Sequence, residues 1–208
     1  MGQKVNPISL RLQVNKDWQS KWFSEKDYAK FLVEDIKLRR AAERKLGKRA
    51  GVARIDVERS PNLLVVTVYT AKPGVVIGRG GSGAEELKAI LSKIAGTNVK
   101  IAIEEVKRPE ANAALVAENV AGQLERRISF RRAMKMSVEN ALKAGASGAK
   151  VMVAGRLNGA EMSRRESFSR GSIPLHTIRA NVEFSQALAH TTYGIIGVKV
   201  WVYKGEEK

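Results

Sequence analysis

The residues whose types and spacing could do chemistry lie in a glycine-rich stretch, residues 75–83, which reads Val-Val-Ile-Gly-Arg-Gly-Gly-Ser-Gly. Glycine has no Cβ, so the backbone here can approach a ligand closely and expose its N–H groups. An amphipathic segment, residues 86–95, follows the turn, and a helix N-terminus just after the turn would add partial positive charge there. The stretch therefore predicts a site for a phosphate group.

Two motifs fit the same residues. Residues 78–83 match the dinucleotide pattern G-x-G-x-x-G, and Glu104 lies about twenty residues on, where an acid that binds ribose is expected. Residues 77–81 equally match the I-G-x-x-G of a K-homology (KH) domain, whose GXXG loop clamps backbone nucleotides. An ordinary glycine-rich turn is the third possibility. Residues 72–74, Lys-Pro-Gly, interrupt the preceding strand and leave one helical turn before the glycines, which favours the KH arrangement of helix, GXXG and helix. The predicted RNA contacts of this loop are Gly78, Arg79, Gly80 and Gly81.

The composition indicates a polyanionic partner. The chain has 208 residues, with 37 Lys and Arg against 21 Asp and Glu, a formal net charge of +16. The excess is shared evenly between residues 1–106 and 107–208, so we expect both halves to contact the polyanion. No apolar run approaches the length of a membrane span and no signal peptide is evident, so the expected location is the cytoplasm.

Enzyme chemistry finds little support in the sequence. There is no cysteine, which excludes disulfides, thiolate zinc and a cysteine nucleophile. His176 and His190 are too few for a histidine-based metal site and are expected to serve packing or hydrogen bonding. With no G-x-S-x-G and no pair of acids at helical spacing facing a cleft, we predict no catalytic residue, no metal and no cofactor.

The first half predicts a compact α+β domain. Residues 1–23 form a basic, then aromatic arm that either follows a phosphate backbone or packs on the domain. Residues 24–106 then predict the order α-β-β-α-α-β, with three strands in one sheet and helices on one face. This order is that of a type II KH domain.

Residues 107–208 predict a second α+β domain. Lys107-Arg108-Pro109 marks the boundary. Two amphipathic helical stripes follow, and glycines at 145 and 148 end the second. Four strand candidates come next, at 150–155, about 163–170, 179–185 and 195–204, which predict a four-stranded sheet with two helices.

Cations on the second of these helices form the clearest basic ridge. With about 100° per residue, Phe130 and Met134 fall on one side of the helix and the cations on the other. If the helix begins near Ser129, two arginines lie in its first turn, where the macrodipole disfavours cations. A phosphate backbone would explain them. The ridge comprises Arg131, Arg132 and Lys135, and further RNA contacts are predicted at Gly2, Lys4, Arg11, Arg156, Arg164, Arg165, Arg170 and Arg179.

Several strings along the chain are distinctive, namely residues 1–7, the loop at 76–81, and residues 123–127, 130–135, 155–161, 174–177 and 190–194. Together they resemble the bacterial small-subunit ribosomal protein S3 family. The similarity runs in order over essentially the whole chain, and several of the strings are specific to that family.

The resemblance implies a type II KH domain followed by the family's own C-terminal domain, in the head of the small ribosomal subunit. It implies ribosomal RNA, mRNA and the neighbouring head proteins S10 and S14 as partners, and no small-molecule substrate. It also implies that Arg131, Arg132 and Lys135 face incoming mRNA beside the mRNA entrance channel, where they help to hold and unwind it.

The chain departs from the family in places. It stops at Lys208 where many relatives carry a further tail, Asn181 replaces the usual Asp, and residues 163–165 are more basic than usual. The missing tail affects only contacts expected beyond the globular domains. The alternative hypothesis is a free-standing KH-type regulator of mRNA, which would not need a basic C-terminal domain of this kind.

Overall fold

The computed structural model describes residues 4–61 and 63–206. It divides into two compact units, Trp18–Lys107 and a second unit that joins Met1–Asp17 to Arg108–Lys208. Each unit has its own sheet and its own hydrophobic core. The arm predicted at residues 1–23 is thus divided between the units after Asp17. Among the described residues, no helix is long and apolar enough to cross a membrane.

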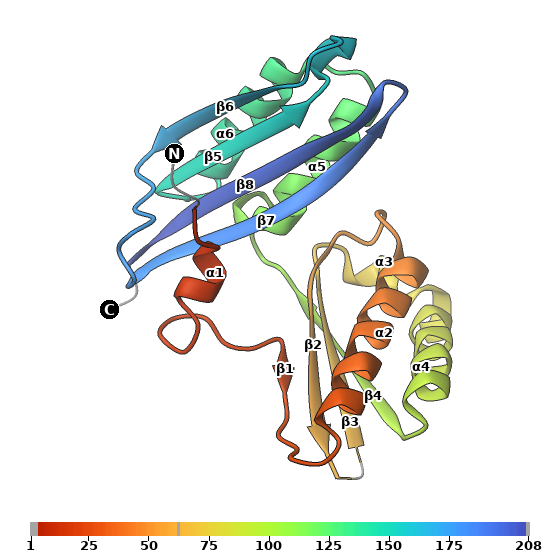
Figure 1. The fold of residues 1–208 in the computed structure, drawn as a ribbon. Coiled ribbons are helices and arrows are strands. Elements are labelled where there is room, and N and C mark those ends of the chain that lie inside the picture. Colours follow the sequence, from red (N-terminus) through yellow and green to blue (C-terminus); the bar gives the residue numbers. More distant parts are fainter. Residues whose placement is uncertain (1–3, 62, 207–208) are drawn as a thin grey trace. The chain divides into compact units, whose positions relative to one another are not determined.

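The unit Trp18–Lys107 has the α-β-β-α-α-β order predicted from the sequence (Figure 1). A two-residue strand, β1 (Ser20–Lys21), precedes this order and pairs in parallel with β2, so the sheet has four strands in the order β1-β2-β3-β4 rather than the predicted three. The prediction missed β1 because two residues are too short to show an alternation. The other elements are α2 (Tyr28–Leu46), β2 (Val52–Ser60), β3 (Leu63–Thr70), α3 (Pro73–Ile77), the 3₁₀ turn η1 (Arg79–Gly81), α4 (Ser82–Ala95) and β4 (Val99–Glu105).

The core of this unit lies between its sheet and the long helices α2 and α4. Alternate residues of β3, namely Leu64, Val66 and Val68, are buried, as the period of two along a strand requires. Leu87 and Leu91 are four residues apart on α4 and fully buried in the same cluster. Burial of one helix face and one sheet face supports the glycine loop, residues 78–81, which begins where α3 ends.

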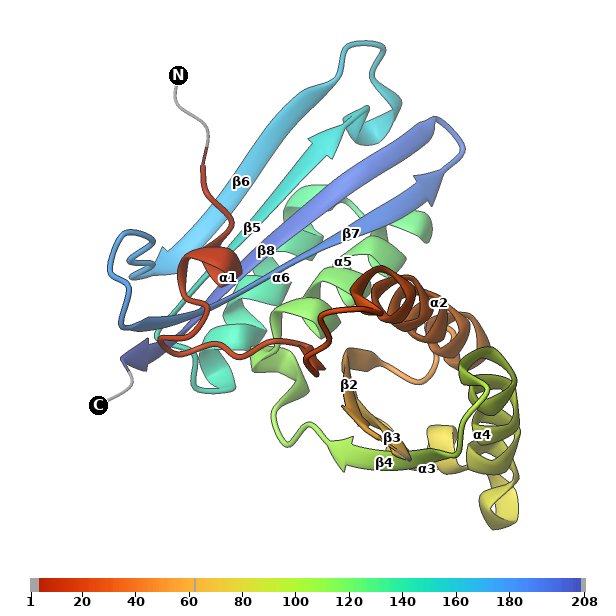
Figure 2. The ribbon, with the colours of Figure 1, turned by 60° about the horizontal axis from the view of Figure 1, so that its bottom comes forward.

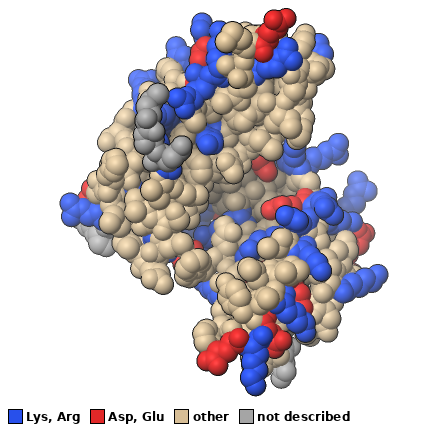
Figure 3. Space-filling view, in the orientation of Figure 1, with Lys and Arg blue, Asp and Glu red and all other residues tan. Residues whose placement is uncertain are grey.

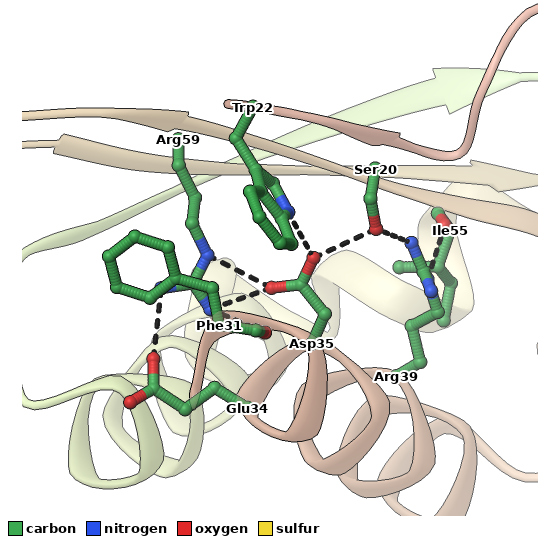
Figure 4. Close-up of polar contacts among 8 residues, drawn as sticks. All are labelled: Ser20, Trp22, Phe31, Glu34, Asp35, Arg39, Ile55 and Arg59. Atoms are coloured by element: carbon green, nitrogen blue, oxygen red, sulfur yellow. Dashed lines mark hydrogen bonds and ion pairs between the residues drawn. The ribbon is translucent and has the colours of Figure 1, made fainter. Parts of the chain in front are cut away.

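A buried carboxylate fastens the start of this unit (Figure 4). Asp35 of α2 is fully buried and accepts hydrogen bonds from Ser20 Oγ at 2.8 Å, Trp22 Nε1 at 2.7 Å and Arg59 Nη2 at 2.6 Å. Arg59 of β2 also pairs with Glu34 at 2.9 Å. Breaking a buried pair by removing one partner costs about 3–5 kcal/mol. The cluster therefore holds residues 20–22 firmly against α2 and β2.

The second unit contains the two helices and four strands predicted for residues 107–208. The strand order is β6-β5-β8-β7, and every neighbouring pair is antiparallel. Both long helices cover the same face of this sheet (Figures 1 and 2). The elements are α1 (Pro7–Leu10), the 3₁₀ turn η2 (Pro109–Ala111), α5 (Ala113–Glu125), α6 (Phe130–Lys143), β5 (Gly148–Gly155), the 3₁₀ turn η3 (Leu157–Gly159), β6 (Arg164–Gly171), β7 (Ala180–Thr191) and β8 (Gly194–Glu206).

The core of the second unit follows from the same periodicities. Val151 and Val153 of β5 and Val198 and Val200 of β8 are fully buried on the helix side of the sheet. The helices contribute a stripe each, and the buried positions of α6 are those placed on one side by the 3.6-residue period. These are Phe130, Ala133, Met134, Ser137, Val138 and Ala141.

Candidate nucleic-acid interface

The glycine loop joins two helices, as the sequence predicts. Helix α3 ends at Ile77, Gly78 follows with φ of +73°, and the 3₁₀ turn leads directly into α4 at Ser82. No side chain caps the first turn of α4, because Gly81 occupies the N-cap position. The first N–H groups of a helix lack intrahelical partners and carry the positive end of its dipole, so they are suited to a phosphate.

The glycines of the loop are needed for two different reasons. Gly80 and Gly81 have φ of +61° and +87°, and a Cβ at either position would meet nothing within 4 Å. At Gly78 a Cβ would lie 2.9 Å from the backbone N of Gly83, and at Gly83 it would lie 2.7 Å from the carbonyl oxygen of Val76. The inner pair therefore leaves open space for a ligand, whereas the outer pair lets α3 and α4 approach each other. Sequence reasoning missed this packing role of Gly83.

The surroundings of the loop can contact both parts of a nucleotide. Arg79 is exposed and directly precedes Gly80 in the chain. Val75 and Ile77, in the helix before the loop, are large apolar residues that are 53% and 41% exposed. The loop thus offers backbone donors and one cation for phosphate, with apolar surface close by in sequence for a base.

The basic ridge on α6 projects from the face opposite the core. Arg131, Arg132 and Lys135 are all exposed, while Phe130 and Met134 beneath them are buried. Ser129 takes the N-cap position as predicted, but its side chain makes no capping hydrogen bond. The first turn of α6 holds no acid. Two cations therefore stand at the positive end of the helix without compensation from its own first turn.

One expectation about this ridge is wrong. The sequence predicts Glu139, on the same helix, as the only acid near the ridge, yet Arg131 Nε lies 3.2 Å from a carboxylate oxygen of Glu166 on β6. The hydrogen bond to Glu166, and then its charge, raise the pKa of Arg131 above the usual value. Glu139 instead lies 4.0 Å from Arg170. Arg132 and Lys135 form no ion pair with any carboxylate in the described part of the chain, so they are the free cations of the ridge.

Arg11, predicted as an RNA contact, is used inside the protein. Its side chain is fully buried, with Nε 2.7 Å from the carbonyl oxygen of Ala180 and Nη2 2.9 Å from that of Thr177. Further bonds go to the carbonyl oxygens of Pro7, Pro174 and Leu175. Because all three guanidinium nitrogens donate to backbone carbonyls and the side chain has no exposed surface, the assignment of Arg11 to RNA is corrected to a clamp between α1 and the loop before β7.

The remaining predicted contacts are not gathered into one site. Arg156 donates to the carbonyl oxygen of Ala160 at 3.0 Å, Arg164 lies 3.5 Å from Glu166, and Arg179 lies 3.5 Å from Glu206. Gly2 lies outside the described residues. Lys4 and Arg165 are exposed and form no ion pair with a described acid.

The described residues hold no group of three or more His, Asp or Glu side chains able to bind a metal ion. Lys and Arg side chains are spread over the visible surface of both units and outnumber the acids there (Figure 3). The fold and these surfaces define the class of protein, an RNA-binding protein built on a KH domain.

Comparison with known proteins agrees with this class. A KH-domain family model matches residues 37–111, and the model for the C-terminal domain of ribosomal protein S3 matches residues 120–202. Small ribosomal subunit protein uS3 of Brevibacillus brevis is 53% identical over 206 residues, which cover 99% of this chain and 93% of the relative. The uS3 proteins of Halalkalibacterium halodurans and Bacillus anthracis are equally similar, with 94% of each covered. The chain belongs to the uS3 family of small ribosomal subunit proteins, and it is a structural ribosomal component rather than an enzyme.

Proposed function

We propose that this chain, in the small subunit of the cytoplasmic ribosome, holds RNA phosphates in its glycine loop at Gly78, Arg79, Gly80 and Gly81. The observation that carries this is the open space at the Cβ positions of Gly80 and Gly81. Among the described residues, no atom lies within 4 Å of either Cβ position, and the uncapped first turn of α4 follows directly in the chain. A phosphate can therefore approach the backbone at the place where the helix dipole favours an anion.

We also propose that the α6 ridge faces mRNA at the entrance channel of the subunit. The fold gives no reason for Arg132 and Lys135, which are exposed and unpaired with any described acid. Cations that hold single-stranded phosphates favour the melted form of a downstream duplex. Translocation supplies the work, so the ridge needs no ATP and only biases the equilibrium between paired and unpaired strands.

The test of this second proposal is ribosome progress on matched mRNAs with and without a stable hairpin ahead of the entrance. Arg131→Ala, Arg132→Ala and Lys135→Ala together are expected to leave subunit assembly near normal and to slow only the hairpin message. A control removes three exposed cations elsewhere, Lys26→Ala, Lys30→Ala and Lys37→Ala. Equal slowing on both messages would contradict a role in unwinding. Loss of subunit assembly would show instead that the ridge binds ribosomal RNA.

Protein neighbours complete the proposal. The family resemblance suggests the head proteins S10 and S14, and exposed apolar side chains of the Trp18–Lys107 unit supply suitable contacts. Phe23 is 86% exposed and Val33 is 49% exposed, and neither has a use in RNA phosphate binding. We take residues 1–23, 24–106 and 107–208 as the functional divisions of the chain, the arm, the KH domain and the C-terminal domain.

The rival function is a free-standing KH-type regulator of mRNA. A regulator would bind mRNA without the ribosome, whereas a ribosomal component stays on small subunits when weak electrostatic contacts are removed. Co-sedimentation with small subunits at high salt separates the two. Retention supports the ribosomal proposal, and quantitative release into the free fraction would favour the regulator.

A further inference from the structure

The two long helices of the second unit leave one face of its sheet uncovered. Helices α5 and α6 lie behind it in Figure 1, and only α1 lies on the near side, beside β7. Side chains alternate along each strand, so the residues opposite to the helix-packed ones point to this free side. We call it the open sheet face, and its central residues are Lys150 and Met152 of β5, Arg165, Ser167 and Ser169 of β6, and Lys199 and Trp201 of β8.

The strand register brings these residues into two rows. Lys150 lies opposite Ser169 on one side and opposite Trp201 on the other. Met152 lies opposite Ser167 and Lys199 in the same way. The first row therefore places Lys150 directly beside Ser169, whereas in the second row Met152 separates Ser167 from Lys199. Ser167 and Ser169 on the edge strand β6 and Lys199 on β8 are exposed, whereas Trp201 is buried in an apolar cluster with Met152 and Phe184.

The two faces of this sheet differ in whether their cations are paired with acids. On the helix side the cations are paired: Arg164 with Glu166 at 3.5 Å and Lys204 with Glu183 at 2.7 Å. On the open sheet face Lys150, Arg165 and Lys199 form no ion pair with any described carboxylate. The three acids of the four strands are Glu166, Glu183 and Glu206, and each is bonded to a cation outside this face.

The charged form of Lys150 is disfavoured in the free protein, mainly because the side chain is partly buried. Its Nζ lies 5.7 Å from the centre of the Trp201 ring, and the side chain is only partly exposed. Burial, and then the charge of Lys4, lower the pKa of Lys150. Like charges brought together without an acid are a feature that a bound anion would relieve.

We propose that the open sheet face binds RNA through its phosphate backbone, as a surface separate from the glycine loop and from the α6 ridge. Lys150, Arg165 and Lys199 contact phosphates, and Ser167 and Ser169 donate to phosphate or ribose oxygens. The proposal rests on the ribosomal RNA-binding function and extends it to a third surface.

The burial of Trp201 decides whether the open sheet face contacts the bases or the backbone of RNA. Four-stranded RNA-binding sheets commonly stack bases on exposed aromatic rings. Trp201 is only 7% exposed, and its ring packs against Phe184 with centroids 5.2 Å apart. A base has no free ring face there, so the open sheet face reads the backbone and not the sequence. An acidic protein segment is the competing occupant, and the test distinguishes it.

The first experiment measures the affinity of the full chain for a structured fragment of small-subunit ribosomal RNA at several salt concentrations. Lys150→Gln, Arg165→Gln and Lys199→Gln together are expected to weaken binding at least tenfold at low salt. They should also reduce the slope of log K against log salt by roughly 2–3, since each phosphate contact contributes about 0.7–0.9 to that slope. The control Lys26→Gln, Lys30→Gln and Lys37→Gln has the same net charge. If both triple variants lose equal affinity, only the net charge matters and the proposal is overturned.

The second experiment finds the occupant in assembled small subunits. A photoactivatable phenylalanine analogue is placed at Ser167 or Ser169, both exposed. Crosslinks to RNA are expected; crosslinks to protein alone, or none, would contradict the proposal. If the unaltered chain itself fails to bind the RNA fragment, the proposed function fails as well. If it binds and the sheet variant binds equally, only the open sheet face is excluded.

Discussion

The glycine loop and the α6 ridge are both assigned to RNA, but they are built in opposite ways. The loop carries one exposed cation and depends on backbone shape, with φ of +61° and +87° at Gly80 and Gly81. The ridge has ordinary helical backbone, and its capacity to bind lies entirely in the charge of exposed side chains. Substitutions that change shape without changing charge should therefore damage the loop, and neutralising substitutions should damage the ridge.

The largest expected effect comes from adding both bulk and negative charge to the loop. Gly80→Asp with Gly81→Asp introduces two Cβ atoms and two carboxylates where a phosphate must approach. Binding to single-stranded RNA is expected to fall well over tenfold. The left-handed backbone costs a non-glycine residue roughly 1–2 kcal/mol, less for Asp, so the folded state should persist. Filter binding checks the affinity and thermal unfolding checks the fold. An unchanged affinity in the folded variant would show that the loop does not bind RNA.

A smaller effect is expected from shape alone, at a glycine that does not face the ligand. In Gly83→Ala the new Cβ would lie 2.7 Å from the carbonyl oxygen of Val76 and 3.1 Å from that of Ile77. Helix α4 must move away from α3, at a cost of about 1–3 kcal/mol in the free energy of unfolding. RNA affinity should fall several-fold because the loop between the helices is displaced.

The matched control for that prediction is Gly122→Ala on α5, where a Cβ meets nothing within 4 Å. It should leave RNA affinity unchanged and should not lower stability, because alanine favours a helix. If Gly83→Ala behaved like this control, the close approach of α3 and α4 would have no part in shaping the loop.

The smallest effect is expected at the acid beside the ridge. Glu166→Gln removes the partner of Arg131, whose side chain is 73% exposed. An exposed ion pair contributes only about 0–1 kcal/mol, so stability should hardly change. Freed from its pair, Arg131 can turn to a phosphate, and affinity for single-stranded RNA should rise up to a few-fold. Fluorescence titration measures this, and a fall in affinity would show that Glu166 positions Arg131 for RNA.

Much of this comparison could be predicted from the sequence, because it rests on local patterns. The period of α6 separates Phe130 and Met134 from the cations, and the glycine spacing places the turn between two helices. Both follow from residues that are near neighbours along the chain. The same holds for the order of strands and helices in each unit.

The parts that sequence reasoning missed depend on how separate elements of the structure pack against one another. Arg11 is buried by carbonyl groups near residues 174–180, and nothing near it in sequence marks it off from an exposed arginine. Arg131 meets Glu166 across 35 positions. Gly83 is required by the approach of two helix backbones, a contact that composition does not reveal. Each is a tertiary contact, and no local periodicity encodes it.

The most direct test of the difference between loop and ridge is the salt dependence of binding to one single-stranded RNA. Two variants are compared with the unaltered chain, Gly80→Ala with Gly81→Ala, and Arg131→Ala with Arg132→Ala and Lys135→Ala. The first removes no charge, so its affinity should fall while the slope of log K against log salt stays unchanged. The second removes three cations. Each cation that contacts a phosphate contributes about 0.7 to the slope for a single strand, so the slope should become shallower by roughly 2. Equal slopes for the two variants would contradict the account.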